Sequence, residues 1–196
     1  MCRAGVLPRK ELFEAWEVAR RVRRHVRGGR VVDLAAGHGL LAWTMLILDD
    51  TSPEALCVDV REPASAGKLA AALTAEWPRL QGRVSYLVAP LEHVALRATD
   101  VVVSAHACGG LTDLVIDRAV AAGAFVAVLP CCQERPGGDL AGVDAWVAPA
   151  LAVDLERVVR LRRAGYHVRA QHIPEAVTPK NRLLVAEPPA RAPHPG

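Results

Sequence analysis

The stretch VVDLAAGHGLLAWTMLIL, residues 31–48, carries the signal that decides the fold. Its first five residues, VVDLA, predict a short buried strand, and the apolar run LLAWTMLIL at 40–48 predicts a helix. The glycine-rich turn between them lets backbone amides approach a ligand closely, and the helix N-terminus favours polar or anionic groups. The stretch therefore predicts a strand–turn–helix unit with a ligand at the turn. The same glycines would also suit a turn that only packs tightly.

Short apolar strands and helices alternate along the rest of the chain. The expected strands are residues 31–35, 55–59, 84–88, 101–105, 125–129, 167–173 and 182–187. The expected helices are residues 9–27, 40–48, 64–77, 111–122 and 151–164. Strands separated by helices of this length predict βαβ units around a parallel sheet, and the alternating pattern near 167–173 predicts an antiparallel edge pair. The fold class is therefore α/β, a three-layer sandwich.

Composition favours one ordinary folded domain. The chain has 196 residues, of which 52% are hydrophobic and 23% charged. We expect a single domain over 1–187, opening with the helical segment 9–27, and a disordered proline-rich tail at 188–196. The chain contains no apolar run long enough to span a membrane, and its N-terminus lacks the apolar region of a signal peptide. These features exclude the membrane and secreted classes and predict a cytoplasmic protein.

The five cysteines are odd in number and show no CxxC spacing. This pattern argues against a disulfide framework, a zinc ribbon and a zinc finger. A reducing cytosol suits such a chain, and the sequence predicts no metal site.

An acid closes the second expected strand, and it points to a nucleotide ligand. Asp59 lies twenty residues after Gly39, where a carboxylate can accept hydrogen bonds from the ribose hydroxyls of an adenosine. A dinucleotide site would read GxGxxG, which this turn does not. The turn instead presents, in order, Asp33, Ala35, Gly37 and Gly39. An NAD-dependent oxidoreductase is therefore disfavoured.

This order resembles motif I of the class I S-adenosylmethionine-dependent methyltransferases, in which an acid precedes glycines at alternate positions. Asp33 and residues 37–39 match the motif, and Ala35 stands where the first glycine is usual. The resemblance covers residues 9–187 in element order. It implies a Rossmann-like, seven-stranded, mostly parallel sheet with an antiparallel last strand, and S-adenosyl-L-methionine as cofactor.

The resemblance also implies a set of cofactor contacts. The residue matching Asp33 organises the methionine end of the cofactor, and the one matching Asp59 binds the ribose. Many relatives carry an acid after the third strand for the adenine. Here APLE stands at 89–92, which leaves Glu92 or backbone groups near Leu91 for that role. The full expected set is Asp33, Ala35, Gly37, Gly39, Asp59, Leu91 and Ser104.

Two segments follow the fourth and fifth strands, at the sheet edge where open α/β proteins place their chemistry. They are SAHACGGLTD at 104–113 and LPCCQ at 129–133. Both resemble a branch of methyltransferase domains that includes the acceptor-stem tRNA 2′-O-methyltransferases, as does TPKNRLLVA at 178–186. The branch implies RNA modification, with tRNA as the expected substrate. Gln133 departs from the histidine that the tRNA-modifying members carry there, and this chain has no zinc-finger segment.

His106 and Cys131 are the expected catalytic residues. A neutral imidazole can accept a proton from a hydroxyl or amine, although His106 would equally order its loop through a backbone hydrogen bond. The RNA cytosine-5 methyltransferases use cysteines from these same two strand ends, which would require a thiol of lowered pKa. The alternative is that Cys108, Cys131 and Cys132 are small apolar residues that shape the pocket.

Six arginines fall within residues 20–30, which contain no acid. Arg20, Arg24 and Arg27 share one face of the predicted helix, where they would neutralise RNA phosphates. They would equally form a solvated helix face. Asn181 is a further expected substrate contact. Three hypotheses follow: a methyltransferase acting on RNA, one acting on a small molecule, and a non-catalytic module that binds the cofactor or RNA.

Overall fold

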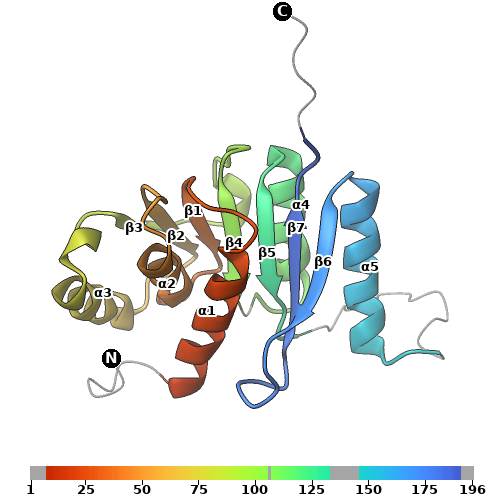
Figure 1. The fold of residues 1–196 in the computed structure, drawn as a ribbon, viewed down its shortest axis with the longest axis horizontal. Coiled ribbons are helices and arrows are strands. Elements are labelled where there is room, and N and C mark those ends of the chain that lie inside the picture. The colour runs from red at the N-terminus through yellow and green to blue at the C-terminus, as the bar shows by residue number, and fades with distance from the viewer. Residues whose placement is uncertain (1–7, 106, 133–145, 191–196) are drawn as a thin grey trace, which may run out of the picture.

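The computed structural model describes residues 8–105, 107–132 and 146–190. Within them, seven strands form one sheet between two layers of helices (Figure 1). The strands are β1 (Val31–Leu34), β2 (Ala55–Asp59), β3 (Val84–Val88), β4 (Val101–Ala105), β5 (Phe125–Leu129), β6 (His167–His172) and β7 (Arg182–Glu187). The helices are α1 (Arg9–Val22), α2 (Leu40–Leu48), α3 (Ala64–Glu76), α4 (Gly110–Ala122) and α5 (Pro149–Arg163), with short 3₁₀ turns η2 (Pro78–Leu80) and η3 (Leu91–His93). The predicted fold class is confirmed.

The order of the strands across the sheet is β3-β2-β1-β4-β5-β7-β6. The pairs from β3 to β5 are parallel, whereas β7 is antiparallel to both of its neighbours. Parallel neighbours need long crossover connections, which the helices supply, whereas β6 and β7 are joined by a loop alone. The antiparallel last strand that the sequence predicts is therefore present.

The first helix is shorter than the predicted segment 9–27, because α1 ends at Val22. The amides of Arg24 and His25 donate to carbonyls three residues earlier, which tightens the chain into a turn. The chain then reverses to enter β1 at Val31. The sequence prediction of the helix end was wrong because this reversal begins before the Gly-Gly pair.

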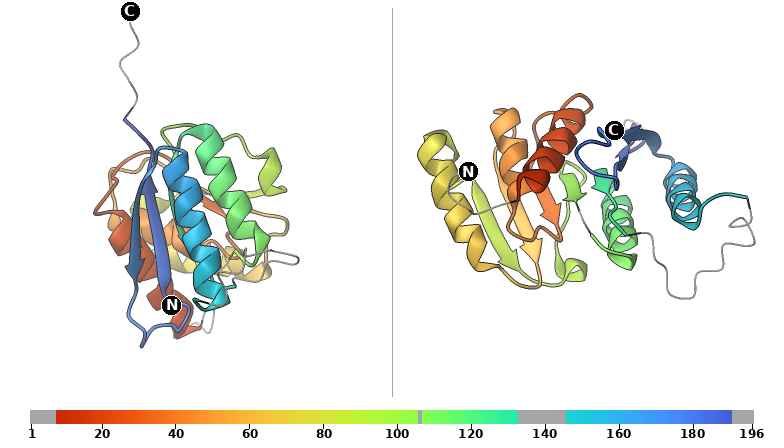
Figure 2. Two further views of the ribbon diagram at one scale, coloured as in Figure 1. Left: turned by 90° about the vertical axis from the view of Figure 1, so that its right-hand side faces the viewer. Right: turned by 90° about the horizontal axis from the view of Figure 1, so that it is seen from below.

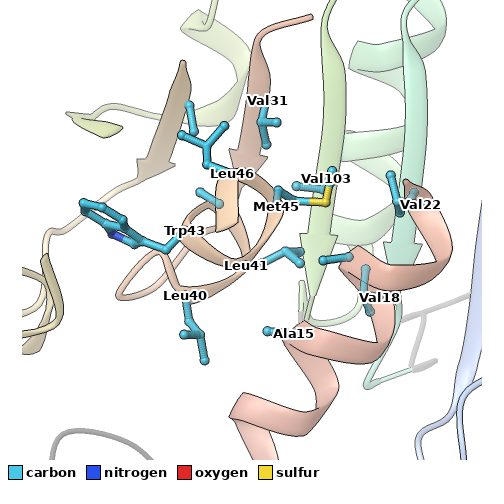
Figure 3. Close-up of a cluster of buried hydrophobic side chains, with 14 of the residues drawn as sticks. Ala15, Val18, Val22, Val31, Leu40, Leu41, Trp43, Met45, Leu46 and Val103 are labelled. Carbon is cyan, nitrogen blue, oxygen red and sulfur yellow. The ribbon is translucent and has the colours of Figure 1, made fainter. Parts of the chain in front are cut away.

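The helices divide between the two faces of the sheet (Figure 2). The core on one face joins residues of α1, α2 and α3 to the sheet, and the core on the other face joins α4 and α5 to it. Figure 3 shows the first core, where Ala15 and Val18 of α1 lie beside Leu41 and Met45 of α2, with Val103 of β4 close by. No helix in the described residues is long and apolar enough to cross a membrane. Of the predicted disordered tail, residues 191–196 lie outside the described residues.

Candidate functional site

A hollow lies at the edge where the parallel strands end, beside the point where the strand order reverses. The helices that follow β1 and β4 pack on opposite faces of the sheet, and open α/β sheets bind ligands where neighbouring connections part in this way. The hydroxyl of Ser104 in β4 donates to the carbonyl of Leu34 in β1 at 2.6 Å and joins the ends of the two strands. The hollow is lined by Glu11, Ala15, Asp33, Ala36, His38, Leu40, Leu41 and Ala105.

The turn after β1 has the backbone geometry that glycine favours. Gly37 and Gly39 both have positive φ, and Gly39 is the N-cap of α2. The amide of Gly37 donates to the Asp59 carboxylate at 2.9 Å, and the Tyr86 hydroxyl donates to the carbonyl of Gly37 at 2.6 Å. The turn is thus held against the ends of β2 and β3. Asp59 therefore lies beside the glycine turn, and its contact with the ribose of the cofactor stays a prediction.

Ala35 lies in the left-handed region with φ of 58°, and it is the one non-glycine residue with positive φ in the described part of the chain. An L-residue in this conformation costs roughly 1–2 kcal/mol. The usual motif has its first glycine here, so the backbone keeps the shape of the motif although the side chain differs. Alanine therefore stores strain at the base of the candidate site.

We expect Ala35→Gly to stabilise the protein by about 1 kcal/mol. The relieved left-handed strain of roughly 1–2 kcal/mol exceeds the roughly 0.4–1 kcal/mol that the extra conformational entropy of glycine in the unfolded chain costs. The free energy of unfolding in urea measures this change. Ala36→Gly is the matched control, since Ala36 has no positive φ, and it should destabilise the protein. If both substitutions destabilise the protein to the same extent, Ala35 is not strained.

Asp33 is a buried carboxyl group at the floor of the hollow. Its side chain accepts the amide of Ala42 in the first turn of α2 at 3.2 Å. Burial, with the nearby negative charge of Asp59 as a lesser cause, raises the pKa of Asp33 to about 7. A cationic ligand would favour the ionised carboxylate, so this site suits a cofactor that carries a sulfonium and an ammonium group. The residues present therefore fit S-adenosylmethionine.

The sequence did not identify the contact between His38 and Glu11. His38 stands between the two glycines of the turn, and its Nε2 atom lies 2.7 Å from a carboxylate oxygen of Glu11 in α1. Both residues line the hollow, so the first turn of α1 closes one side of the site. In the sequence, the helix at 9–27 drew attention only through its arginines. No local pattern marked Glu11 as a partner of the glycine turn.

Two of the predicted cofactor contacts have other roles in this structure. Leu91 is 4% exposed and belongs to the hydrophobic core on the α4 side of the sheet. Its side chain therefore faces the protein interior, and its backbone remains the predicted adenine contact. Ser104 is also buried, and its hydroxyl proton is committed to the Leu34 carbonyl. Ser104 positions the two strands, and its contact with the cofactor stays a prediction.

The expected catalytic residues fall at the ends of β4 and β5. His106 lies outside the described residues. Cys131 is described, and its Sγ atom lies 3.3 Å from that of Cys108 and 3.7 Å from that of Cys132. Burial, together with these neighbouring thiols, raises the pKa of Cys131 to about 12. The thiol form therefore dominates at neutral pH, which favours a shaping role for Cys131 over attack by its thiolate.

The predicted substrate residues are spread over two edges of the sheet. Arg24 and Arg27 lie in the connection from α1 to β1, hence at the edge where the parallel strands begin, and both are exposed. Arg20 lies within α1 and bonds to Glu17 at 3.1 Å. Asn181 precedes the antiparallel strand β7 and therefore lies at the edge where the parallel strands end. The single helix face predicted for the three arginines is wrong, because α1 stops before Arg24.

The comparisons with solved structures show the same fold. An O-methyltransferase family protein from Burkholderia thailandensis aligns over 92% of this chain and 55% of its own length, with 18% identity and a TM-score of 0.57. Precorrin-6y C5,15-methyltransferase from Geobacter metallireducens GS-15 aligns over 88% of this chain and 86% of its own, with 14% identity and a TM-score of 0.55. Sp1610 of Streptococcus pneumoniae, a candidate tRNA (m1A22) methyltransferase, aligns over 90% and 71%, with 15% identity and a TM-score of 0.54. This chain thus spans about half the length of the Burkholderia protein.

A search of curated proteins finds no match to this chain. A family profile described as a methyltransferase domain matches residues 11–135, which include the glycine turn, Asp59 and both cysteine segments up to Cys132. The match covers more than half of the chain and contains the elements that build the hollow. The chain therefore belongs to this family of methyltransferase domains, and S-adenosylmethionine is its cofactor.

Proposed function

We propose that this chain transfers the methyl group of S-adenosylmethionine to RNA, with tRNA as the substrate. The observation that supports S-adenosylmethionine as the methyl donor is the buried Asp33 carboxyl in the hollow under the glycine turn, with Asp59 bonded to Gly37 beside it. The proposal that RNA is the methyl acceptor rests on the surface of α1 and on the segments that resemble the branch of acceptor-stem tRNA 2′-O-methyltransferases.

The surface of α1 combines aromatic rings with positive charge. Phe13, Trp16 and Arg20 follow one another at helical spacing, and the two rings are 47% and 42% exposed. Phe13, Trp16 and Trp77 line one hollow of about 280 Å³ between α1 and α2. Exposed aromatic faces stack on unpaired bases, and such stacking tolerates many sequences. The sequence count of eight aromatic residues did not reveal that three of them gather here.

The arginines beyond α1 extend this surface. Arg21 bonds to Glu17 and Arg30 to Asp100, so part of the run is neutralised within the protein. Arg24 and Arg27 are exposed, and neither forms an ion pair among the described residues. The 14 residues of α1 span about 21 Å, from the hollow at one end to these arginines at the other. A strand of RNA lying along α1 would therefore place one nucleotide at the site and phosphates several nucleotides away at the arginines.

The chain's own groups act chiefly by positioning. The cofactor supplies an electrophilic methyl group on a sulfonium. Asp33 and the turn at 35–39 hold the donor, and the ends of β4 and β5 hold the acceptor in line with it, which supplies most of the rate gain. His106 is our proposed proton acceptor for the attacking hydroxyl or amine. The turn at 131–132 shapes the acceptor side of the pocket.

The first experiment is calorimetric titration of the purified protein with S-adenosylhomocysteine and with NAD, followed by transfer of labelled methyl groups to a tRNA pool. We expect micromolar binding of S-adenosylhomocysteine, no binding of NAD, and label that ribonuclease releases. Asp59→Ala should weaken S-adenosylhomocysteine binding several-fold without unfolding the protein. Cofactor binding with label only on small molecules would contradict RNA as the methyl acceptor. Cofactor binding without transfer to any acceptor would favour a non-catalytic module.

The arginine surface has its own test, in which RNA affinity is measured against salt concentration. Replacing both Arg24 and Arg27 with alanine should weaken RNA binding and leave cofactor binding unchanged. The plot of log binding constant against log salt concentration should become shallower, its slope smaller in magnitude by about 1–2. Arg163→Ala is the matched control, because Arg163 is exposed on α5, which covers the opposite face of the sheet. Equal slopes for the double variant and the control would exclude this surface as the RNA contact.

A further inference from the structure

Three cysteine thiols meet at the edge of the sheet where β4 and β5 end. Cys108 lies just before α4, and Cys131 and Cys132 directly follow β5. The three Sγ atoms all lie within 4.8 Å of one another. The Cys108–Cys131 separation is 3.3 Å and the Cys131–Cys132 separation is 3.7 Å. Neither the methyl-donor hollow nor the α1 surface uses these thiols.

The separations match those of thiolates around a shared ion. A zinc–sulfur bond is about 2.3 Å, so two thiolates at a tetrahedral zinc ion lie about 3.8 Å apart. A disulfide would instead need about 2.05 Å between two sulfurs and would leave the third thiol outside the bond. The Cys108–Cys131 and Cys131–Cys132 separations lie close to the first value, and closing the three thiols around an ion needs only small movements of the side chains.

The fold positions the thiols before any ion binds. β4 and β5 pair in parallel register up to Ala105 and Leu129, which carries the two following segments to one edge. The Thr112 hydroxyl donates to the carbonyl of Ala107 at 2.6 Å and fixes the chain on either side of Cys108. The guanidinium of Arg157, 1% exposed, donates to the carbonyl of Gly109 at 3.3 Å and anchors the same segment to α5. Such support of the segments that carry the ligands is what a metal site requires.

We propose that Cys108, Cys131 and Cys132 bind one zinc ion as thiolates, and that its fourth position is left for water or a donor atom of the substrate. Zinc with three protein ligands keeps such an open position, whereas a purely structural zinc has four. Cys108 is exposed, so the open position faces outward. The site lies at the same sheet edge as the methyl-donor hollow, because β1, β4 and β5 are parallel and all three end there.

The proposal replaces the sequence expectation of no metal site. That expectation rested on the absence of CxxC spacing, which is typical of ribbons and fingers. Here Cys131 follows Cys108 by 23 positions, and strand pairing rather than a local turn brings the two together. Binding must displace the protons of the three thiols, so the affinity for zinc should rise with pH.

Cadmium titration of the reduced, chelator-stripped protein tests the site, since cadmium thiolates absorb in the ultraviolet. We expect one equivalent of cadmium with this absorption, and we expect cadmium to release zinc one for one from the zinc-loaded protein. Replacing any one of Cys108, Cys131 and Cys132 with serine should weaken binding at least about tenfold, and replacing all three should abolish it. Cys57→Ala is the matched control, because Cys57 is a buried core residue outside the cluster, and it should keep the full equivalent.

Binding of S-adenosylhomocysteine and the far-ultraviolet circular dichroism spectrum show whether the serine variants fold. X-ray absorption of the zinc-loaded wild-type protein gives an answer that needs no variant, and we expect three sulfur neighbours at about 2.3 Å. Fewer than three sulfur neighbours would overturn the proposal. So would the lack of cadmium absorption, or absorption that persists in the folded triple variant. None of these readouts depends on methyl transfer, so the proposal stands or falls separately from the RNA substrate.

Discussion

Asp33→Asn is expected to stabilise the cofactor-free protein at pH 8 and at the same time to weaken S-adenosylmethionine binding about 100-fold, equivalent to about 3 kcal/mol. The stabilisation follows from burial, which raises the pKa of Asp33 from 3.8 to about 7. At pH 8 the folded protein must hold a buried charge that the unfolded chain holds in water. Asparagine removes this cost, at most about 4 kcal/mol.

The same shift sets the direction of the pH dependence. Between about pH 4 and pH 7, the folded state keeps the Asp33 proton that the unfolded chain has already released. The contribution of Asp33 to stability therefore falls as the pH rises through this window. Affinity for S-adenosylmethionine should move the other way. It should rise by up to about tenfold per pH unit up to pH 7, because the cationic cofactor requires the ionised carboxylate.

Asp49 provides a matched control with the opposite sign. It is another buried aspartate, at the far end of α2. Burial alone would raise the pKa of Asp49, but hydrogen bonds from Thr51, Gly28 and Ser52 outweigh it and lower the pKa. Asp49→Asn should therefore destabilise the protein at pH 8 and leave cofactor affinity unchanged.

Denaturation in urea and calorimetry, each at pH 5, 6, 7 and 8, measure both effects for the two variants. If Asp33→Asn destabilises the protein as Asp49→Asn does, burial of the ionised Asp33 carboxylate does not destabilise the folded state. If its cofactor affinity keeps the pH dependence of the wild type, Asp33 is not the group that meets the cation.

Gly39→Ala is expected to destabilise the protein by about 3 kcal/mol. A Cβ atom at Gly39 would lie 2.6 Å from the sulfur of Cys57, well inside van der Waals contact. The residue also has φ of 81°, which costs an alanine roughly 1–2 kcal/mol, and overpacking adds a similar amount. In a chain of this size, the loss corresponds to a fall in Tm of about 6–12 °C.

Two further variants separate the steric clash from the backbone strain. At Gly37, which also has positive φ, a Cβ atom would meet nothing within 4 Å, so Gly37→Ala should cost only the backbone strain of about 1–2 kcal/mol. Cys57→Ala removes the clashing sulfur, and the next nearest atom to the Gly39 position is the Cβ of Cys57 at 3.6 Å. Cys57→Ala should therefore recover about 1–2 kcal/mol in the Gly39→Ala background and nothing in the Gly37→Ala background.

Thermal unfolding of the single and double variants completes this cycle. Equal losses for the two glycine variants, or a Cys57→Ala effect that is the same in both backgrounds, would show that the turn does not pack on Cys57. The cycle also reports on function, because a displaced Gly39 would move the turn that faces the cofactor. Binding of S-adenosylhomocysteine should weaken in Gly39→Ala and recover in the double variant.

The sequence determined the elements whose signals are local. The strand–turn–helix unit at 31–48, the parallel strands and the antiparallel β7 follow from apolar periodicity, turn residues and the lengths between them. The methyl-donor motif is also local, because its acid, glycines and second-strand acid lie within one βαβ unit. These features could be predicted because each depends on neighbouring residues along the chain.

Only the tertiary structure decided what depends on packing between distant segments. The end of α1 follows from the reversal into β1, which placed Arg24 and Arg27 at the opposite sheet edge from the hollow. The state of the Asp33 carboxyl follows from burial, which no sequence window reports.

The cysteines illustrate the same division. The sequence showed two cysteine segments at strand ends and no metal-ligand spacing, which led to the expectation of no metal. The register between β4 and β5 is what brings Cys108 beside Cys131. Strand pairing is a long-range property, so the spacing of residues along the chain cannot contain it. The sequence by itself thus determined the fold and the cofactor, whereas tertiary contacts decided the charge at the site, the surface beside it and the meeting of the three thiols.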